Sequence, residues 1–341
     1  MKPPLNYFSM LKIGSLKLKS NLILAPMAGV TDLPFRMLCR KFGAELAFVE
    51  MINCRSISHK SRKTRHMLST LPKDKPLGVQ VLGCEEKFIL KALDVLKVYK
   101  FDILDFNAAC PAKKVVRRGE GAALLKEPGK LHKLLKLIVK NSKIPVTVKM
   151  RLGWDKDTVN AREVALCAQD AGVSGLFIHG RTKTQEYGGS VDYEVIADVK
   201  KALNIPLIAS GDVFSAQLAG KMLNETNCDG LVIARGSFGN PWIFKEIKEF
   251  LKTGKLLPKP ERKKVVKVML EHLGASVDFY GERNGVILFR KFFGWYTKGI
   301  RNIRPLREQS SRAKTRLEME SMISKTLYIT ICLLISYKTI L

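Results

Sequence analysis

Short apolar segments recur along the first 255 residues of the chain, with more polar stretches between them. Each segment is rich in aliphatic and β-branched side chains. Eight of them stand out, at residues 22–25, 46–51, 77–82, 103–106, 146–150, 175–178, 206–209 and 231–234. Nearly continuous apolar runs of this length are typical of strands buried on both faces of a parallel sheet.

The stretches between these segments show helical periodicity. In the fourth interval, apolar residues fall at positions i, i+3, i+4 and i+7, namely Leu131, Leu134, Leu135 and Ile138. Eight strand–helix units in about 250 residues is the size of a (β/α)8 TIM barrel. A doubly wound open sheet usually carries a glycine-rich turn after its first strand. Here that strand is followed by Pro-Met-Ala-Gly, so we predict an α/β fold with a TIM barrel over residues 1–253.

The pattern changes after the linker at residues 254–260. Apolar side chains return at helical spacing (Val266, Met269, Leu270, Leu273), and no strand-like run follows until the last residues. We therefore predict a small helical domain over residues 260–341. Within residues 290–316, nine Lys and Arg residues accompany one acid, Glu308, and four aromatic residues lie among them. These aromatics could stack on bases, or they could form the buried face of a helix whose basic face is in solvent.

The chain as a whole is strongly basic. Its 59 Lys and Arg residues and 31 Asp and Glu residues give a formal net charge of +28, while 46% of the residues are hydrophobic. That apolar content excludes a disordered chain. A folded basic surface implies a polyanionic partner, either nucleic acid or an anionic membrane, unless a lysine-rich genome has raised the charge of every surface.

The cysteines and the chain ends bear on the compartment. Seven scattered cysteines without a CxxC pair indicate reduced thiols and no metal site. The apolar run at residues 327–337 is shorter than the ~18 residues that suggest a membrane span. We therefore expect a cytoplasmic monomer without stable membrane association.

Polar and reactive residues lie where the predicted strands end, which is where TIM barrels carry their chemistry. Cys110 follows a strand directly before a proline, beside Asn107 and ahead of a basic loop, and is the candidate catalytic residue. Lys149 falls within a strand, where a charge facing the barrel interior needs a partner. Glycines at the ends of the last two strands favour a phosphate site. Together these residues indicate a phosphate-bearing cofactor across the barrel mouth, and a flavin fits that outline.

Seven ordered motifs resemble those of the bacterial tRNA-dihydrouridine synthases, most closely the B-type subgroup. They are LAPMAGVTDLPFR, VQVLG, DFNAACPAKKVVRRGEGAALL, VTVKMRLGWD, FIHGRT, ASGDVFS and ARGSFGNPWIF. The resemblance runs from about residue 22 to 242 and more loosely to 324. It implies that the protein binds FMN, takes hydride from NADPH or NADH, and reduces uridine in tRNA to 5,6-dihydrouridine.

The resemblance also implies roles for particular residues. Cys110 would be the proton donor. The flavin would be bound by Pro26, Met27, Ala28, Gln80, Lys149, His179, Ser210, Gly211, Asp212, Ala234 and Arg235. The tRNA would be contacted by Asn107, Lys113, Lys114, Arg117, Arg151, Arg290 and Lys291.

Three positions depart from the family pattern, because Ala109 and Ala234 stand where it has glycine and Ser210 where it has asparagine. Two alternative functions remain open. One is a flavin-dependent reductase of a free pyrimidine, similar to dihydroorotate dehydrogenase. The other is a tRNA-binding paralogue that has lost its flavin.

Overall fold

Eight parallel strands form a closed barrel in the computed structural model, which describes residues 10–58 and 62–329. β4 pairs with both β3 and β6, and β11 pairs with β3, so the sheet has no free edge at this point. The strands are β3 (Leu22–Leu24), β4 (Leu46–Phe48), β6 (Leu77–Leu82), β7 (Ile103–Ala108), β8 (Val146–Arg151), β9 (Gly175–His179), β10 (Leu207–Ser210) and β11 (Gly230–Ile233). All eight coincide with the predicted segments, and the TIM barrel is confirmed.

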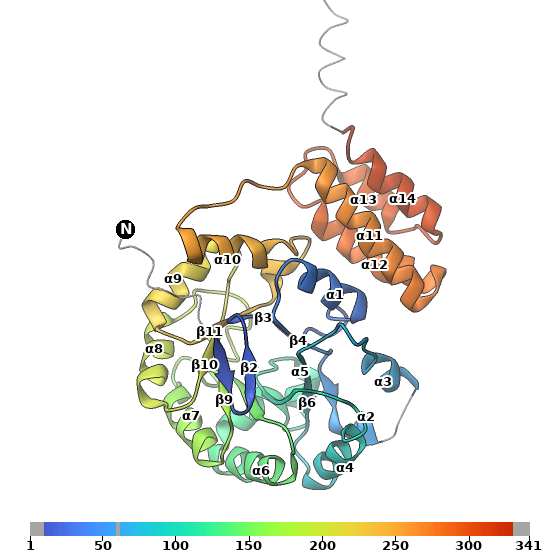
Figure 1. Ribbon diagram of the computed structural model, residues 1–341. Helices are drawn as coiled ribbons and strands as arrows, with labels where there is room; N and C mark the ends of the chain where they lie inside the picture. The colour runs from blue at the N-terminus through green and yellow to red at the C-terminus, as the bar shows by residue number, and fades with distance from the viewer. Residues whose placement is uncertain (1–9, 59–61, 330–341) are drawn as a thin grey trace, which may run out of the picture. The chain divides into compact units, whose positions relative to one another are not determined.

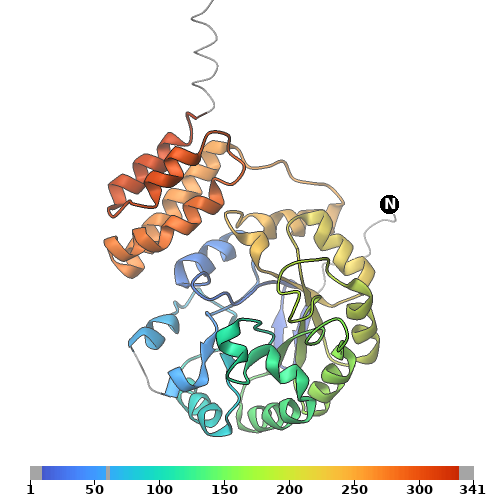
Figure 2. The same ribbon diagram turned by 180° about the vertical axis from the view of Figure 1, so that it is seen from behind.

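Helices surround the strands on the outside of the barrel (Figure 1; Figure 2, from behind). The larger ones are α1 (Leu33–Lys41), α4 (Glu86–Leu96), α6 (Pro128–Asn141), α7 (Ala161–Asp170), α8 (Tyr193–Ala202), α9 (Ala216–Thr226) and α10 (Ile243–Thr253). The four residues whose spacing predicted α6 are all buried. Shorter elements carry the loops between them: β5 (Ile52–Asn53), α2 (Cys54–Ser58), α3 (Arg62–Met67), α5 (Lys113–Val116) and the 3-10 turns Gly121–Lys126 and Arg235–Ser237.

A hairpin of two three-residue strands closes the amino-terminal end of the barrel. β1 (Leu11–Ile13) and β2 (Leu16–Leu18) are antiparallel, and three of their side chains are buried in the cluster that fills the barrel. Strand residues such as Ile23, Phe48 and Phe177 belong to the same cluster. The opposite, carboxyl-terminal end is therefore the open one, as the fold requires for a functional site.

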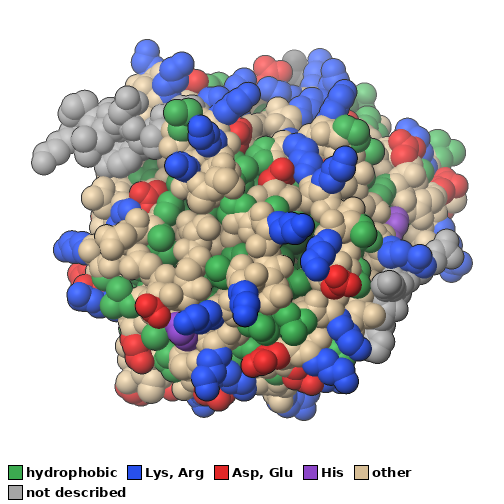
Figure 3. All heavy atoms as spheres, turned by 60° about the horizontal axis from the view of Figure 1, so that its bottom comes forward, with side chains coloured by type: hydrophobic (Ala, Val, Ile, Leu, Met, Phe, Trp, Pro, Cys, Tyr) green, Lys and Arg blue, Asp and Glu red, His purple; other side chains and the backbone are tan. Residues whose placement is uncertain are grey.

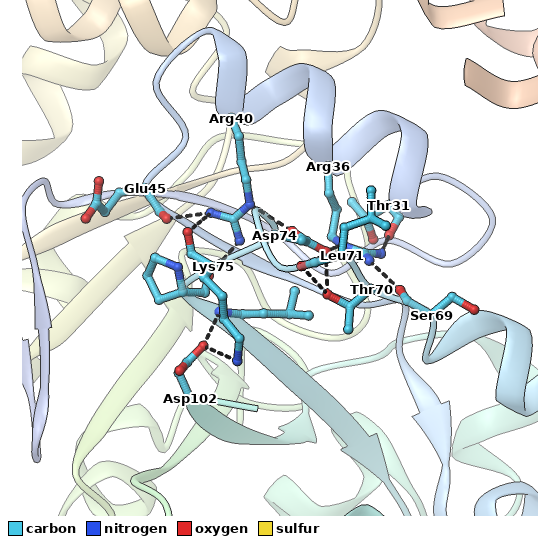
Figure 4. A network of polar contacts seen from close by, with 12 residues as sticks. Thr31, Arg36, Arg40, Glu45, Ser69, Thr70, Leu71, Asp74, Lys75 and Asp102 are labelled. Carbon is cyan, nitrogen blue, oxygen red and sulfur yellow. Dashed lines mark hydrogen bonds and ion pairs between the residues drawn. The ribbon is translucent and has the colours of Figure 1, made fainter. Parts of the chain in front are cut away.

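A buried ion-pair network holds α1 against the segment at residues 69–76 (Figure 4). Arg36 and Arg40 both reach Asp74, at N–O distances of 2.7 and 2.8 Å, and the carboxylate is fully buried. Arg36 also donates to the carbonyl oxygen of Thr31, which lies in the loop between β3 and α1. The network thus ties the first loop at the open end of the barrel to the body of the fold.

The chain divides into two compact units: one comprises residues up to 236 together with 242–256, and the other comprises 237–241 and the residues from 257 onward. The second unit contains the helices α11 (Arg262–Tyr280), α12 (Glu282–Tyr296), α13 (Arg304–Ser310) and α14 (Arg316–Lys325). The predicted domain extends to residue 341, and its end, with the apolar run after 329 and Cys332, lies outside the described residues. No helix in the described ranges is long and apolar enough to cross a membrane.

Three of the four aromatic residues within 290–316 lie in the core of the helical unit. Phe292, Phe293 and Tyr296 are buried, together with His272 of α11, and Trp295 stacks on Phe238 with ring centroids 4.0 Å apart. Of the two interpretations left open by the sequence, the structure therefore favours a buried aromatic face. On the face shown in Figure 3, Lys and Arg side chains are spread over the surface and are not gathered in one patch.

Candidate active site

Asn107 shapes the loop that carries Cys110. The amide oxygen of Asn107 accepts the backbone N–H groups of Ala109 and Cys110, at 3.0 and 2.8 Å. Its amide nitrogen donates to Gln80 at 2.8 Å and to the sulfur of Met51 at 3.1 Å. An amide has two donor hydrogens and two acceptor lone pairs, so the protein itself uses the full hydrogen-bonding capacity of Asn107. The expected substrate contact by Asn107 stays a prediction.

Gly121 allows a second backbone contact to the loop that carries Cys110. The backbone N–H of Ala122 donates to the carbonyl oxygen of Cys110 at 3.1 Å. Gly121 has φ +60°, and a Cβ atom there would lie 2.7 Å from that same oxygen. Only glycine satisfies both conditions. The sequence shows this residue as part of a Gly-Glu-Gly motif, but a short glycine motif alone does not reveal what it packs against.

Glu120 anchors this segment to a neighbouring strand. Its carboxylate accepts from the amide of Asn53 at 2.9 and 3.0 Å and forms an ion pair with Arg118 at 2.9 Å. Neither Asn53 nor Glu120 was expected in the site, because nothing local in the sequence places β5 beside the Cys110 loop.

The Cys110 side chain is half-buried, and burial raises the pKa of its thiol above the ordinary value. The thiol therefore holds its proton at neutral pH, as a general acid must. Of the predicted tRNA contacts, Lys113, Lys114 and Arg117 follow in and just after α5, and all three are exposed.

Lys149 lies on β8 directly across from Asn107 of β7. Desolvation inside the barrel lowers its pKa to about 8, while Asp105 acts in the opposite direction. No hydrogen bond or ion pair joins its ammonium group to another residue within 10–58 and 62–329. Such a half-buried cation, facing the open end of a barrel, is suited to a polar ligand atom.

Arg151 ties the cysteine loop to the loop after β9. Its Nε donates to the carbonyl oxygen of Ala109 at 2.9 Å, and its guanidinium also donates to the carbonyl oxygens of Thr182 and Glu186, each at 2.8 Å. Tyr187, in this second loop, is exposed and lies between the guanidinium groups of Arg151 and Arg235. The predicted tRNA contact by Arg151 stays a prediction, since its donors are largely used within the protein.

His179, at the end of β9, carries a buried nitrogen, Nε2, that has no hydrogen-bond partner among the described residues. Burial lowers the pKa of the imidazole well below its usual range, and the nearby cations Arg151, Lys149, Arg181 and Arg235 lower it further. The ring is therefore neutral and lies in a region of positive potential. The Ser210 hydroxyl lies 3.4 Å from its Nδ1.

Asp212 holds two of these cations in place. Its carboxylate forms ion pairs with Arg181 and with Arg235, the latter at 2.7 Å. Asp212 has φ +50°, a left-handed conformation that non-glycine residues seldom adopt. The adjacent Gly211 has φ +138°, and a Cβ atom there would meet the side chain of Val191 at 2.7 Å. Asp212 thus fixes the positions of both arginine side chains.

Two half-buried apolar side chains, Met27 and Ala234, pack on top of the barrel core at the open end. The backbone N–H of Met27 donates to the hydroxyl of Thr31 at 2.9 Å. This hydrogen bond stabilises the turn that contains Pro26 and the exposed Ala28. The last two predicted contacts, Arg290 and Lys291, belong to the helical unit. There Arg290 donates twice to the carbonyl oxygen of Ala313, at 2.6 and 3.0 Å.

These features together fit a cofactor with a flat polar ring and an anionic tail. Met27 and Ala234 offer an apolar surface that suits a ring. Among the described residues, neither the Lys149 ammonium group nor the His179 Nε2 atom has a hydrogen-bond partner, and four cationic groups lie near the neutral His179. No group of three or more His, Cys, Asp or Glu residues in the described part of the chain could hold a metal ion. The fold and the residues at this end define a TIM-barrel protein with a candidate site at the carboxyl ends of its strands.

Solved structures share this fold at low sequence identity. Morphinone reductase is 14% identical with a TM-score of 0.55, over 76% of this chain and 92% of that one. The old yellow enzyme homologue from Zymomonas mobilis is 12% identical with a TM-score of 0.52, over 74% of this chain and 94% of that one.

Sequence comparison identifies the family. The family model described as dihydrouridine synthase matches residues 23–330. A probable tRNA-dihydrouridine synthase of Rickettsia bellii is 43% identical over 86% of this chain and 90% of its own length. The tRNA-dihydrouridine synthase B of Pseudomonas aeruginosa is 41% identical over 89% of this chain and 92% of its own length. The chain belongs to the dihydrouridine synthase family, and is an oxidoreductase, as its motifs predicted.

Proposed function

We propose that this protein reduces particular uridines of tRNA to 5,6-dihydrouridine, with FMN as its bound cofactor and NADPH as the reductant. One observation carries the proposal: the open end of the barrel brings together a protonated thiol, Cys110, a half-buried cation, Lys149, and a neutral imidazole, His179, whose Nε2 has no hydrogen-bond partner among the described residues. Family membership and the relatives named above support the same reaction.

The residues around the barrel mouth would bind the cofactor in distinct ways. Pro26, Met27 and Ala28 would lie against its ring, and Gln80, which has one N–H and one lone pair left after its contacts with Asp105 and Asn107, would bind the ring's polar edge. Lys149 would supply positive charge at that edge.

The tail of the cofactor would lie on the other side of the barrel mouth. It would be bound by His179, Ser210, Gly211, Ala234 and Arg235, with Asp212 orienting Arg235. The arginines Arg151, Arg181 and Arg235 lower the pKa of His179 there, and the positive potential they create suits a phosphate group.

When bound, FMN would supply the hydride that adds to C6 of the uracil ring, and NADPH would return the flavin to its reduced form. The chain's own contribution is the proton for C5. Cys110 keeps that proton because burial raises the pKa of its thiol, and the loop contacts from Asn107, Gly121 and Arg151 set where the sulfur lies. A uridine must leave its base stack to reach such a site.

The basic residues of the chain would bind the RNA backbone during this step. Lys113, Lys114 and Arg117 are exposed immediately after Cys110, and the net charge of +28 favours a polyanion. The helical unit would contribute further backbone contacts, including Lys291. We propose that the enzyme acts as a monomer in the cytoplasm without stable membrane association.

The proposal is tested on the purified full-length protein and in cells. The protein should carry flavin absorbance, its released cofactor should be FMN, and tRNA from cells lacking the gene should lose dihydrouridine that the intact gene restores. A colourless protein that still binds tRNA would support a flavin-free paralogue instead. A yellow protein that reduces a free pyrimidine but not tRNA would establish the alternative reductase, and a parallel assay with NADH decides the reductant.

A further inference from the structure

A continuous row of buried hydrogen bonds runs from β8 to the backbone of Cys110. The hydroxyl of Thr147 donates to one oxygen of Asp105 at 2.7 Å, and the amide of Gln80 donates to the other at 2.6 Å. Asn107 donates to Gln80 at 2.8 Å and accepts from the backbone N–H of Cys110 at 2.8 Å. Thr147, Asp105 and Gln80 are at most 1% exposed, and Asn107 is 6% exposed.

Strand register places these residues in two layers of the barrel interior. Asp105 of β7 lies across from Gln80 of β6 on one side and from Thr147 of β8 on the other. Asn107 lies two residues nearer the open end, across from Lys149. Asp105 is thus one layer below the site and does not itself line the barrel mouth.

The direction of every hydrogen bond in the row is set by its two ends. An ionised carboxylate can only accept, so Gln80 must turn its nitrogen toward Asp105 and its oxygen toward Asn107. Asn107 must then donate to that oxygen, which leaves its own oxygen for the backbone N–H groups of Ala109 and Cys110. If the amide of Gln80 or Asn107 were reversed, its oxygen would face another acceptor and its N–H groups would face another donor. The row therefore has only one arrangement in which every hydrogen bond is formed.

We propose that Asp105 is a positioning residue for the reaction: through Gln80 and Asn107 it fixes the loop that carries Cys110. The role of Cys110 rests on the function proposed above, whereas the geometry of the row does not. Burial raises the pKa of Asp105 to about 6, so the carboxylate is ionised at neutral pH and imposes this direction under working conditions. The same charge raises the pKa of Lys149 against the effect of burial.

Amide hydrogen exchange of the segment at residues 107–112 tests the proposal without substrate or cofactor turnover. Asp105→Leu removes the acceptor at the end of the row, so exchange at the Ala109 and Cys110 amides should accelerate by about ten-fold or more. Asp105→Asn restores an oxygen for Gln80 and should return exchange to within about three-fold of the native rate. If Asp105→Leu does not fold, Gln80→Met breaks the row one link later and should give the same acceleration.

Thr147→Val is the matched control, because it removes a hydrogen bond to the same carboxylate without touching the amide row. Its exchange should stay within about three-fold of native. With tRNA, Asp105→Leu should lower kcat by about ten-fold or more and change KM by less than about two-fold. Native exchange in Asp105→Leu, or equal acceleration in Thr147→Val, would overturn the proposal. An inactive native protein with the expected exchange pattern would count against the proposed function alone.

Discussion

The side-chain oxygen of Asn107 accepts the backbone N–H of Cys110 at 2.8 Å. Asn107, the last residue but one of β7, thus holds the backbone at the start of the loop that follows the strand. The contact is local in sequence, but its orientation depends on Gln80 of the neighbouring strand. Hydrogen bonds of the barrel interior therefore continue to the backbone of the candidate proton donor.

Cys110→Ala should separate the two halves of the proposed reaction. The variant keeps the residues expected to bind the flavin, so bound flavin and NADPH oxidation should remain, while tRNA reduction falls by about 100-fold or more for want of the proton donor. Cys167→Ala removes a thiol from α7 on the outside of the barrel and serves as the control. Full activity in Cys110→Ala would remove the thiol from the mechanism.

Gly121→Ala should displace the Cys110 loop. The added methyl group would lie 2.7 Å from the carbonyl oxygen of Cys110, at a φ of +60° that alanine seldom adopts. A displacement of the catalytic group by about 1 Å can cost about 100-fold in rate. We expect kcat for tRNA reduction to fall at least ten-fold with flavin still bound. Gly129→Ala, whose Cβ would meet nothing within 4 Å, should match the native enzyme.

Lys149 should make activity and stability respond to alkaline pH in opposite directions. Its pKa is lowered to about 8 from 10.5, so above about pH 8 the folded protein loses the ammonium charge and tRNA reduction should fall. In the same range the unfolded chain still binds that proton, so the free energy of unfolding gains a contribution that rises with pH. Rate profiles and urea unfolding of native and Lys149→Met proteins measure both. Identical profiles for the two proteins would show that Lys149 is not the titrating group.

Asp74→Asn should destabilise the protein more than loss of an exposed ion pair. The change leaves Arg36 and Arg40 buried without a countercharge (Figure 4), which costs about 3 kcal/mol or more in comparable sites. Glu85→Gln removes the partner of Arg55, in a pair whose side chains are 57% and 53% exposed, and should cost less than about 1 kcal/mol. Urea unfolding measures both, and equal effects would contradict the role given to the buried network.

The strands and their order could be predicted from sequence because a buried parallel strand leaves a local record, a short apolar run between helical periods. The hairpin of β1 and β2 escaped prediction because three-residue strands carry too little pattern. For the aromatic residues at 292–296 the sequence left two interpretations open, base stacking or a buried helix face, because spacing alone does not tell which side of a helix is covered. In the structure Phe292, Phe293 and Tyr296 are buried.

The candidate site likewise contains some residues that the sequence indicates and others that only the structure reveals. Cys110 and His179 became candidates from sequence because they stand at or just after the ends of predicted strands, which meet at one rim in a barrel, and Lys149 because it is a charged residue within a strand. Asp105, Asn53, Glu120 and Gly121 did not, because their roles depend on which residue of the adjacent strand or loop they face. By itself the sequence determined the barrel, the family and the residue types at its rim. Only the tertiary structure decided which of these residues form hydrogen bonds or ion pairs with one another, because strand register and loop closure bring together groups that are far apart along the chain.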